Sequence, residues 1–98
     1  MPNTIGGGLI DRSLSVLTAS STTVMEANKG RQYLLLVNNS ANDIWVDLQG
    51  GTAASGALGC IKLIASTGYF EMVGPFVSTS KITARAVTGD SNLTAFEG

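Results

Sequence analysis

Apolar residues along this chain recur in short runs that turn-forming residues interrupt. The run Leu14–Thr18 alternates apolar and polar positions. The run Ile44–Leu48 does the same, with Ile44, Val46 and Leu48 expected on one side of a strand. Nowhere do apolar residues keep a spacing of three and four over about 11 residues, which is the pattern of an amphipathic helix. The pattern therefore predicts an all-β domain.

The runs number seven or eight and are separated by turns every ~8–12 residues. This spacing predicts a single small β-sandwich or β-barrel of seven to eight short antiparallel strands. Two hairpins are expected. The first joins Cys60–Ala65 to Tyr69–Val73, and the second joins Lys81–Val87 to Asn92–Glu97. Pro75 separates the two hairpins, because proline cannot donate to a strand ladder.

One run, from Tyr33 to Val37 in the stretch RQYLLLVNNS, is apolar without interruption. A strand that is apolar on both faces is covered on both sides. Since a small sandwich has only two sheets, we expect the second face to contact another subunit. The alternative is a closed barrel in which the loop Gly50–Gly59 folds over the outer face. Either interpretation buries Leu35, so Leu35→Asp is expected to prevent folding.

The N-terminus is expected to form a flexible arm over residues 1–12, followed by the β domain over residues 13–98. Three consecutive glycines, Gly6–Gly8, would lose much backbone entropy on ordering. Ile5, Leu9 and Ile10 give this segment apolar anchors. It is either a frayed terminus or an arm that orders on a neighbouring chain.

Charge is sparse, with 13% charged residues and a net charge of -1. Soluble domains carry about 25% charged residues. A surface with so few charges has two interpretations. The protein is either a β-rich domain that simply has a neutral surface, or a domain whose surface largely contacts other subunits. Without a basic surface we expect no nucleic-acid partner. No stretch approaches the ~18–20 apolar residues of a membrane span, so we expect no membrane partner.

Candidate chemistry is limited, because the chain has no histidine and a single cysteine, Cys60. Classical zinc sites and nucleophile–histidine catalysis are therefore excluded. The seven acidic residues are scattered, and a chain of 98 residues is too short to enclose a substrate cleft. We expect no enzymatic activity, no catalytic residue, no metal site and no cofactor.

Trp45 is expected on the face opposite Ile44 and Val46. An outward tryptophan can be covered by a loop, pack against a second subunit, or stack on a sugar together with Tyr33 or Tyr69. In the second case Trp45→Ala should leave the monomer folded and weaken assembly. The candidate interface residues are Ile5, Leu9, Ile10, Tyr33, Leu34, Leu36 and Trp45.

Four stretches together resemble small β-rich accessory proteins of tailed bacteriophage virions. They are RQYLLLVNNSANDIWVDLQGG, IKLIASTGYFEM, VSTSKITARAV and the closing LTAFEG. In that family an Arg-led strand ending in NNS precedes an I-W/Y-V strand. A Gly-rich loop, a G-Y hairpin, a V-x-T-x-x-I stretch and a terminal EG follow. The similarity covers about residues 27–98, contains no catalytic signature and leaves out the N-terminal arm.

The resemblance implies a structural protein of the virion, assembled in the host cytoplasm, such as a capsid decoration (cement) or fibre-associated protein. We expect it to bind the major capsid protein or other virion proteins. We also expect a homo-oligomer, with a trimer favoured because a trimer fits the local three-fold points of a capsid. A tail or fibre-base adaptor is the alternative within the virion. A free-standing carbohydrate-binding module is the alternative from another class.

Overall fold

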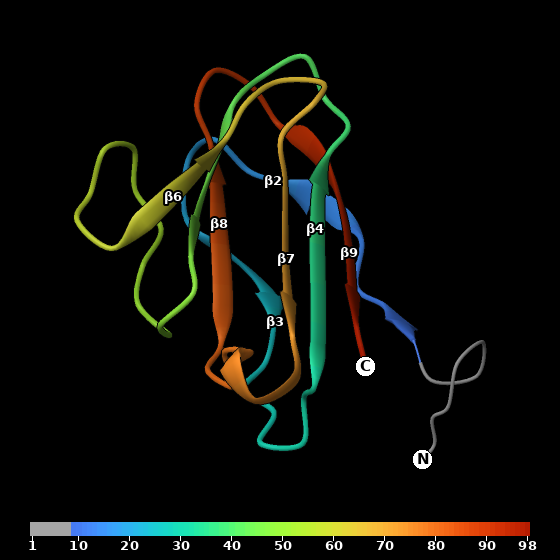
Figure 1. Cartoon of the computed structure of the whole chain (residues 1–98). Coiled ribbons are helices and arrows are strands. Elements are labelled where there is room, and N and C mark those ends of the chain that lie inside the picture. Colours follow the sequence, from blue (N-terminus) through green and yellow to red (C-terminus); the bar gives the residue numbers. More distant parts are fainter. Residues whose placement is uncertain (1–8) are drawn as a thin grey trace.

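The computed structural model describes residues 9–98, and this part of the chain is built from strands (Figure 1). The all-β prediction is confirmed. Nine short strands are present in the described residues, against seven to eight expected, together with one short 3-10 helix. The elements are β1 (Ile10–Asp11), β2 (Leu14–Val16), β3 (Thr22–Met25), β4 (Tyr33–Asn38), β5 (Ile44–Asp47), β6 (Cys60–Leu63), β7 (Tyr69–Val73), η1 (Gly74–Phe76), β8 (Ile82–Ala86) and β9 (Ser91–Glu97).

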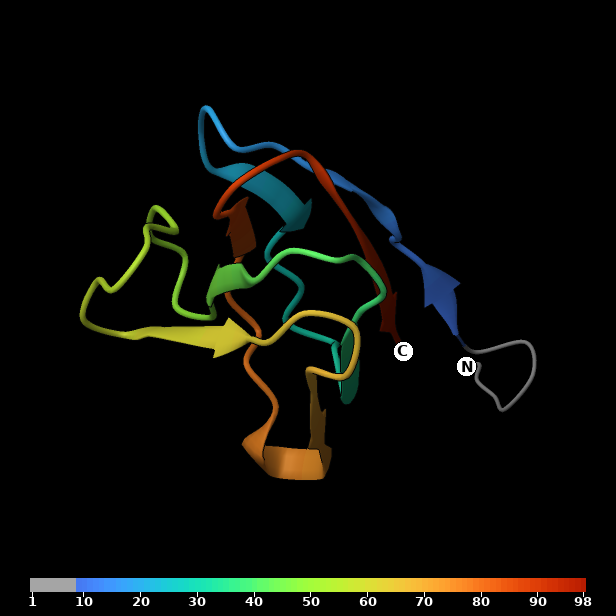
Figure 2. The same ribbon diagram turned by 90° about the horizontal axis from the view of Figure 1, so that it is seen from above.

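The strands form two antiparallel sheets that pack face to face as a sandwich (Figure 2). The five-stranded sheet has the order β1-β9-β4-β7, with β2 also paired to β9, and is called the β4 sheet below. The four-stranded sheet has the order β3-β8-β5-β6 and is called the β5 sheet. Of the two architectures that the sequence left open, the structure is thus the sandwich and not the closed barrel.

Strand pairing joins the first half of the chain to the second half. β2 pairs with β9, β3 with β8, β4 with β7 and β5 with β6, all antiparallel. These four pairs form one long two-stranded ribbon whose tip is the loop between β5 and β6. The ribbon is rolled into two sheets by two further pairings, β4 with β9 and β5 with β8. This strand order is that of a jelly roll.

Both predicted hairpins are wrong. β6 and β7 lie in different sheets, and so do β8 and β9. The segment expected to be the first hairpin turn instead crosses from one sheet to the other. Gly68 is required there, because a side chain on it would collide with the backbone of Leu63 and Ile64. The turn signals in the sequence mark where strands end, and they do not specify which strands pair.

The core lies between the sheets and is formed by alternate residues of both. Leu34 and Leu36 from β4 meet Ile44 and Val46 from β5, and all four side chains are fully buried. β3 departs from strict alternation, since the register shifts between Thr23 and Met25. Such a bulge turns two successive residues inward, and both Val24 and Met25 are buried. The core residues are Val16, Val24, Met25, Leu34, Leu36, Ile44, Val46, Leu63, Ile82, Ala84, Ala86, Leu93 and Ala95.

The predicted boundary between arm and domain, after residue 12, lies too late in the sequence. Ile10 and Asp11 form β1, which pairs with Glu97 and Phe96 of β9. The backbone N–H of Arg12 donates to the carbonyl oxygen of Ala95 at 2.7 Å. The sheet therefore includes the end of the predicted arm, because the edge of β9 offers backbone partners to it. The rest of that arm, residues 1–8, lies outside the described residues.

Candidate interaction surface

The two faces of β4 have different surroundings. Leu34, Leu36 and Asn38 point into the core with 0% exposure. Leu35 and Val37 alternate with them and point outward, where they are half-buried. The prediction of Leu34 and Leu36 as interface residues is therefore wrong. A strand that is apolar throughout does not reveal which alternate set faces the core, and a shift of one residue exchanges the two faces.

The outward side of β4 continues into an apolar strip across three strands. In register with Leu35 lies Phe96 of β9, and Val37 lies beside Tyr69 of β7. Tyr69 is 70% exposed. The outer strip, as we name it, consists of Tyr33, Leu35, Val37, Tyr69, Val73 and Phe96. No strand or helix of residues 9–98 lies over it (Figure 2).

Both charged groups that accompany the outer strip are acidic. The Tyr33 hydroxyl donates a hydrogen bond of 2.7 Å to Glu71, and this bond raises the pKa of Tyr33 above its usual value. Asp11 of β1 lies in register with Phe96 at the other side of the sheet. None of the strands of the β4 sheet contains lysine or arginine. The outer face of this sheet is thus apolar with a negative charge on each side.

The outer face of the β5 sheet is built around Trp45. Its neighbours in register are Lys62 on β6 and Arg85 on β8. The Lys62 ammonium lies 5.9 Å from the centroid of the Trp45 ring, within the range of a cation–π contact. Arg85 donates from Nε to the carbonyl oxygen of Thr18 at 2.9 Å. Trp45 is half-buried and lies outside the core, as the alternation of Ile44–Leu48 predicted.

The three aromatic residues proposed as a sugar platform do not share a surface. Trp45 lies on the outer face of the β5 sheet, whereas Tyr33 and Tyr69 lie on the outer face of the β4 sheet. The two outer faces of a sandwich point in opposite directions. Trp45 therefore cannot stack on a ligand together with either tyrosine of the same chain.

The loop between β5 and β6 leaves the sandwich body and returns, as both views show (Figures 1 and 2). Where it contacts the body it covers the β5 sheet. The carbonyl oxygen of Gly51 accepts a 2.8 Å hydrogen bond from the Thr83 hydroxyl, and Ala53 N–H donates to Ser21 Oγ at 3.0 Å. The alternative in which this loop covers the outer side of β4 is therefore wrong, because its partners belong to the opposite sheet. Leu58, farther along the loop, is fully exposed.

One end of the sandwich holds a cluster of charged and polar side chains around Glu97. The Glu97 carboxylate accepts hydrogen bonds from Arg12 Nε at 2.8 Å, Arg31 Nε at 2.9 Å and Asn28 Nδ2 at 3.1 Å. Arg31, only 2% exposed, also donates to the backbone carbonyl oxygens of Glu26, Ser78 and Ser80. This cluster fastens β1, the β3–β4 connection and β9 to one another.

Two opposing effects act on the Glu97 carboxyl group. Burial alone raises its pKa, because it penalises the charged form. Hydrogen bonds from Asn28, Arg12 and Arg31, with the positive charge of Arg31, act in the other direction and hold the pKa of Glu97 below its usual value. Glu97 is therefore a buried carboxylate that its partners keep ionised. Its hydrogen bonds are all to side chains of the same chain, which makes the role structural.

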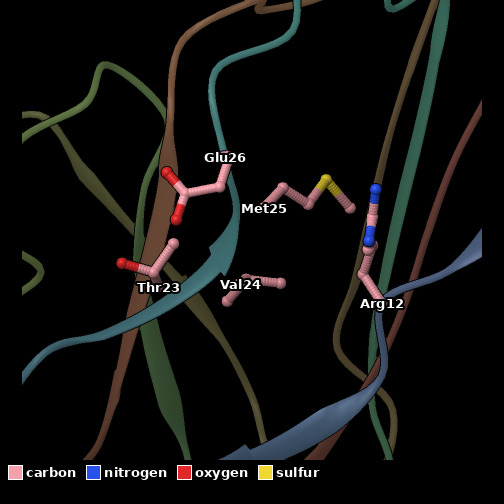
Figure 3. Close-up of a pocket in the computed structure, with 5 residues that line it drawn as sticks. All are labelled: Arg12, Thr23, Val24, Met25 and Glu26. Atoms are coloured by element: carbon pink, nitrogen blue, oxygen red, sulfur yellow. The ribbon is translucent and has the colours of Figure 1, made fainter.

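A hollow of about 190 Å³ lies beside β3 and is lined by Arg12, Thr23, Val24, Met25 and Glu26 (Figure 3). Val24 and Met25 point from β3 toward Arg12, and Thr23 and Glu26 point to the other side of the strand. The hollow offers one guanidinium opposite apolar side chains. Thr23 and Glu26 supply a hydroxyl and a carboxylate on the side of the strand away from the guanidinium.

A second hollow of about 480 Å³ lies between the β3–β4 turn and the η1 region, with Lys29, Arg31 and Pro75 among its lining residues. Its lining contains no aspartate or glutamate. Among residues 9–98 no cluster of three or more cysteine, aspartate or glutamate side chains could hold a metal ion. Within the same residues no helix is long and apolar enough to span a membrane.

The remaining predicted interface residues lie near the edge of the β4 sheet or outside the described chain. Leu9 and Ile10 are about half exposed, next to β9. Ile5 lies outside the described residues. Sequence reasoning missed Leu35, Val37 and Phe96 as surface residues. For Phe96 one signal was present: Leu93 and Ala95 alternate with it along β9 and are buried, which places Phe96 on the outward side. Comparisons with family models, curated proteins and solved structures find no match to this chain.

Proposed function

We propose that this protein is a structural component of a bacteriophage virion, most directly a capsid decoration (cement) protein that binds the outer shell as a homo-oligomer. The observation that carries the proposal is the outer strip. Large apolar surfaces that remain open on a small domain mark sites of protein–protein contact. The sequence resemblance supplies the kind of particle, and the outer strip supplies a surface through which copies of the protein would join into the homo-oligomer that binds it.

Such a protein would act by mass action. A ligand that binds only the assembled shell stabilises that shell by an amount set by its concentration and affinity. The major capsid protein, or another virion protein, is the proposed partner, and a trimer is the proposed oligomer. A rigid jelly roll with few charges suits this role, since its open surface needs no rearrangement before it docks.

A tail or fibre-base adaptor would use the same surface, and only the number of copies per particle distinguishes it from a decoration protein. The carbohydrate-binding alternative gains no support from the arrangement of the aromatic residues. Trp45 is separated from Tyr33 and Tyr69 by the thickness of the sandwich, and Lys62 lies over its ring. A glycan site would need a continuous aromatic platform.

The experiment is co-sedimentation of the purified protein, in saturating excess, with intact particles of its source, with copies counted by quantitative mass spectrometry. A copy number on the order of hundreds per particle would support a decoration protein, because it requires a site repeated over the symmetric shell. A dozen or fewer copies would point to a tail or vertex location. Absence from the pellet would overturn the virion proposal.

A matched pair of variants links this result to the outer strip. Val73→Asp places a charge at an exposed position of the strip, and Leu58→Asp places the same charge on the exposed loop between β5 and β6. We expect Val73→Asp to lower particle occupancy by about tenfold and Leu58→Asp to leave it unchanged, because a charge is costly only where the surface becomes buried. The reverse order would place the docking surface on the loop.

A further inference from the structure

We infer that copies of this chain bind one another head to tail, with the outer face of the β4 sheet of one copy against the outer face of the β5 sheet of the next. The inference deepens the proposed function and rests on it, because the proposed decoration protein binds the shell as a homo-oligomer. It assigns a second copy of this chain as the occupant of the outer strip. The two faces differ in charge in the way such a contact requires. The loop between β5 and β6 covers the Thr83 side of the β5 face, where Thr83 is 4% exposed and donates to Gly51, so the contact would use the Trp45 and Lys62 side.

The charges on the two faces are complementary. The β4 sheet presents Glu71 and Asp11, and its strands contain no lysine or arginine. The β5 sheet presents the exposed Lys62 beside Trp45, with Asp47 as the one acid among its strands. Arg85, on the other side of Trp45, is half-buried and donates to the carbonyl oxygens of Thr18 and Ala19. Within the described residues neither Lys62 nor Glu71 makes an ion pair. Opposite charges across an interface guide association and fix its register.

The strand order sets which residues would meet. Short connections hold β2 next to β3 at one side of the sandwich and β6 next to β7 at the other, so the sheets run in parallel order. A second copy placed in the same orientation on the β4 sheet therefore lays its β5 over β4, its β6 over β7 and its β8 over β9. Figure 2 shows this arrangement of the two layers in one copy.

Three contacts follow from that placement. The Trp45 ring of the second copy would cover Leu35 and Val37, the most apolar part of the outer strip. Its Lys62 would reach Glu71, and its Arg85 would lie over Phe96. An aromatic anchor near the centre with a polar rim around it is a common composition of a protein interface.

A two-fold contact of the outer strip with itself fits less well. It would bring the Glu71 and Asp11 carboxylates of one copy near the same groups of the other, and like charges across an interface repel. A contact between two different faces avoids this repulsion. Such a contact closes into a ring when the rotation between copies allows it, and otherwise extends as an open stack. The unrotated placement described above gives the open stack, and the proposed cyclic trimer would need a rotation of about 120° between successive copies.

The test is sedimentation equilibrium of the full chain over a range of concentrations, with charge reversals at the predicted pair. Glu71→Lys and Lys62→Glu each place like charges together and should weaken self-association by about tenfold. The double variant, Glu71→Lys with Lys62→Glu, restores the pair and should recover the wild-type affinity to within about threefold. Lys29→Glu is the matched control for Lys62→Glu, because it makes the same charge change at an exposed position in the turn between β3 and β4, which belongs to neither sheet.

Circular dichroism of each variant distinguishes a loss of folding from a loss of association. Because Glu71 and Lys62 are both exposed, the variants should keep the wild-type spectrum. Three results would overturn the inference: a wild-type protein that stays monomeric, a double variant that is no better than the single ones, or an association that Glu71→Lys strengthens and Lys62→Glu leaves unchanged. The last result would show a two-fold contact. A monomer that still binds particles would overturn this inference alone, and a self-associating chain that binds no particle would overturn only the proposed function.

Discussion

The two faces of β4 carry nearly the same kinds of side chain and have different environments. Leu34 and Leu36 lie in a closed core, whereas Leu35 and Val37 form the centre of an open apolar strip. In most strands of a sandwich the outward residues are polar, because water covers them. Under the proposed function, this uninterrupted apolar strand combines two roles, one in folding and one in contact with another molecule.

The largest expected effect is on the inner face. Leu36→Asp should leave the chain unfolded, because a charge without a partner in the core costs several kcal/mol. This is a large part of the 5–15 kcal/mol that stabilises an ordinary domain. Circular dichroism and a thermal scan would show it. A cooperative transition near that of the wild type would contradict the placement of Leu36 in the core.

A second effect concerns the cluster around Glu97 at one end of the sandwich. Arg31→Ala should lower the free energy of unfolding by about 3 kcal/mol or more, because it removes the most buried partner of the Glu97 carboxylate. Lys62→Ala, at an exposed position, should change stability by less than about 0.5 kcal/mol. Urea titrations of the two variants would measure this difference, and equal losses would contradict the role of Arg31.

The free energy of unfolding should depend on pH because of Glu97. Its folded pKa lies below the ordinary value of 4.5, so its contribution is fully present above about pH 4.5. The contribution is lost as the pH falls through the lower folded pKa. Glu97→Gln should therefore be less stable than the wild type at pH 7, and the difference should shrink in acid. Glu26→Gln, an exposed control, should follow the wild type, and a constant difference for Glu97→Gln would contradict the account.

The sequence was sufficient for those properties that depend on local pattern. The all-β class and the outward position of Trp45 follow from period-two alternation and from turn residues, whereas the choice between sandwich and barrel stayed open. Strand pairing did not follow, since β8 and β9 are close in the sequence but lie in different sheets. Their partners are chosen by long-range packing of the rolled ribbon, which no local signal encodes.

The candidate surface was only partly accessible from the sequence, for a related reason. The run Tyr33–Val37 identified the correct strand but not which alternate residues face the core, and this error placed Leu34 and Leu36 on the surface. The cluster around Glu97 depends on Arg31, which lies 66 positions away in the chain. Both features could be recognised only once the register of β4 with β9 was known.

The most direct test of the account compares Leu35→Asp with wild type in two measurements on the same samples. The sequence alone favours an unfolded variant, whereas the structure places Leu35 on the outer face. We expect a free energy of unfolding within about 1–2 kcal/mol of wild type. Sedimentation equilibrium should at the same time show loss of self-association. A variant that fails to fold would show that Leu35 belongs to the core, and a folded variant that still associates would show that the outer strip is not the assembly surface.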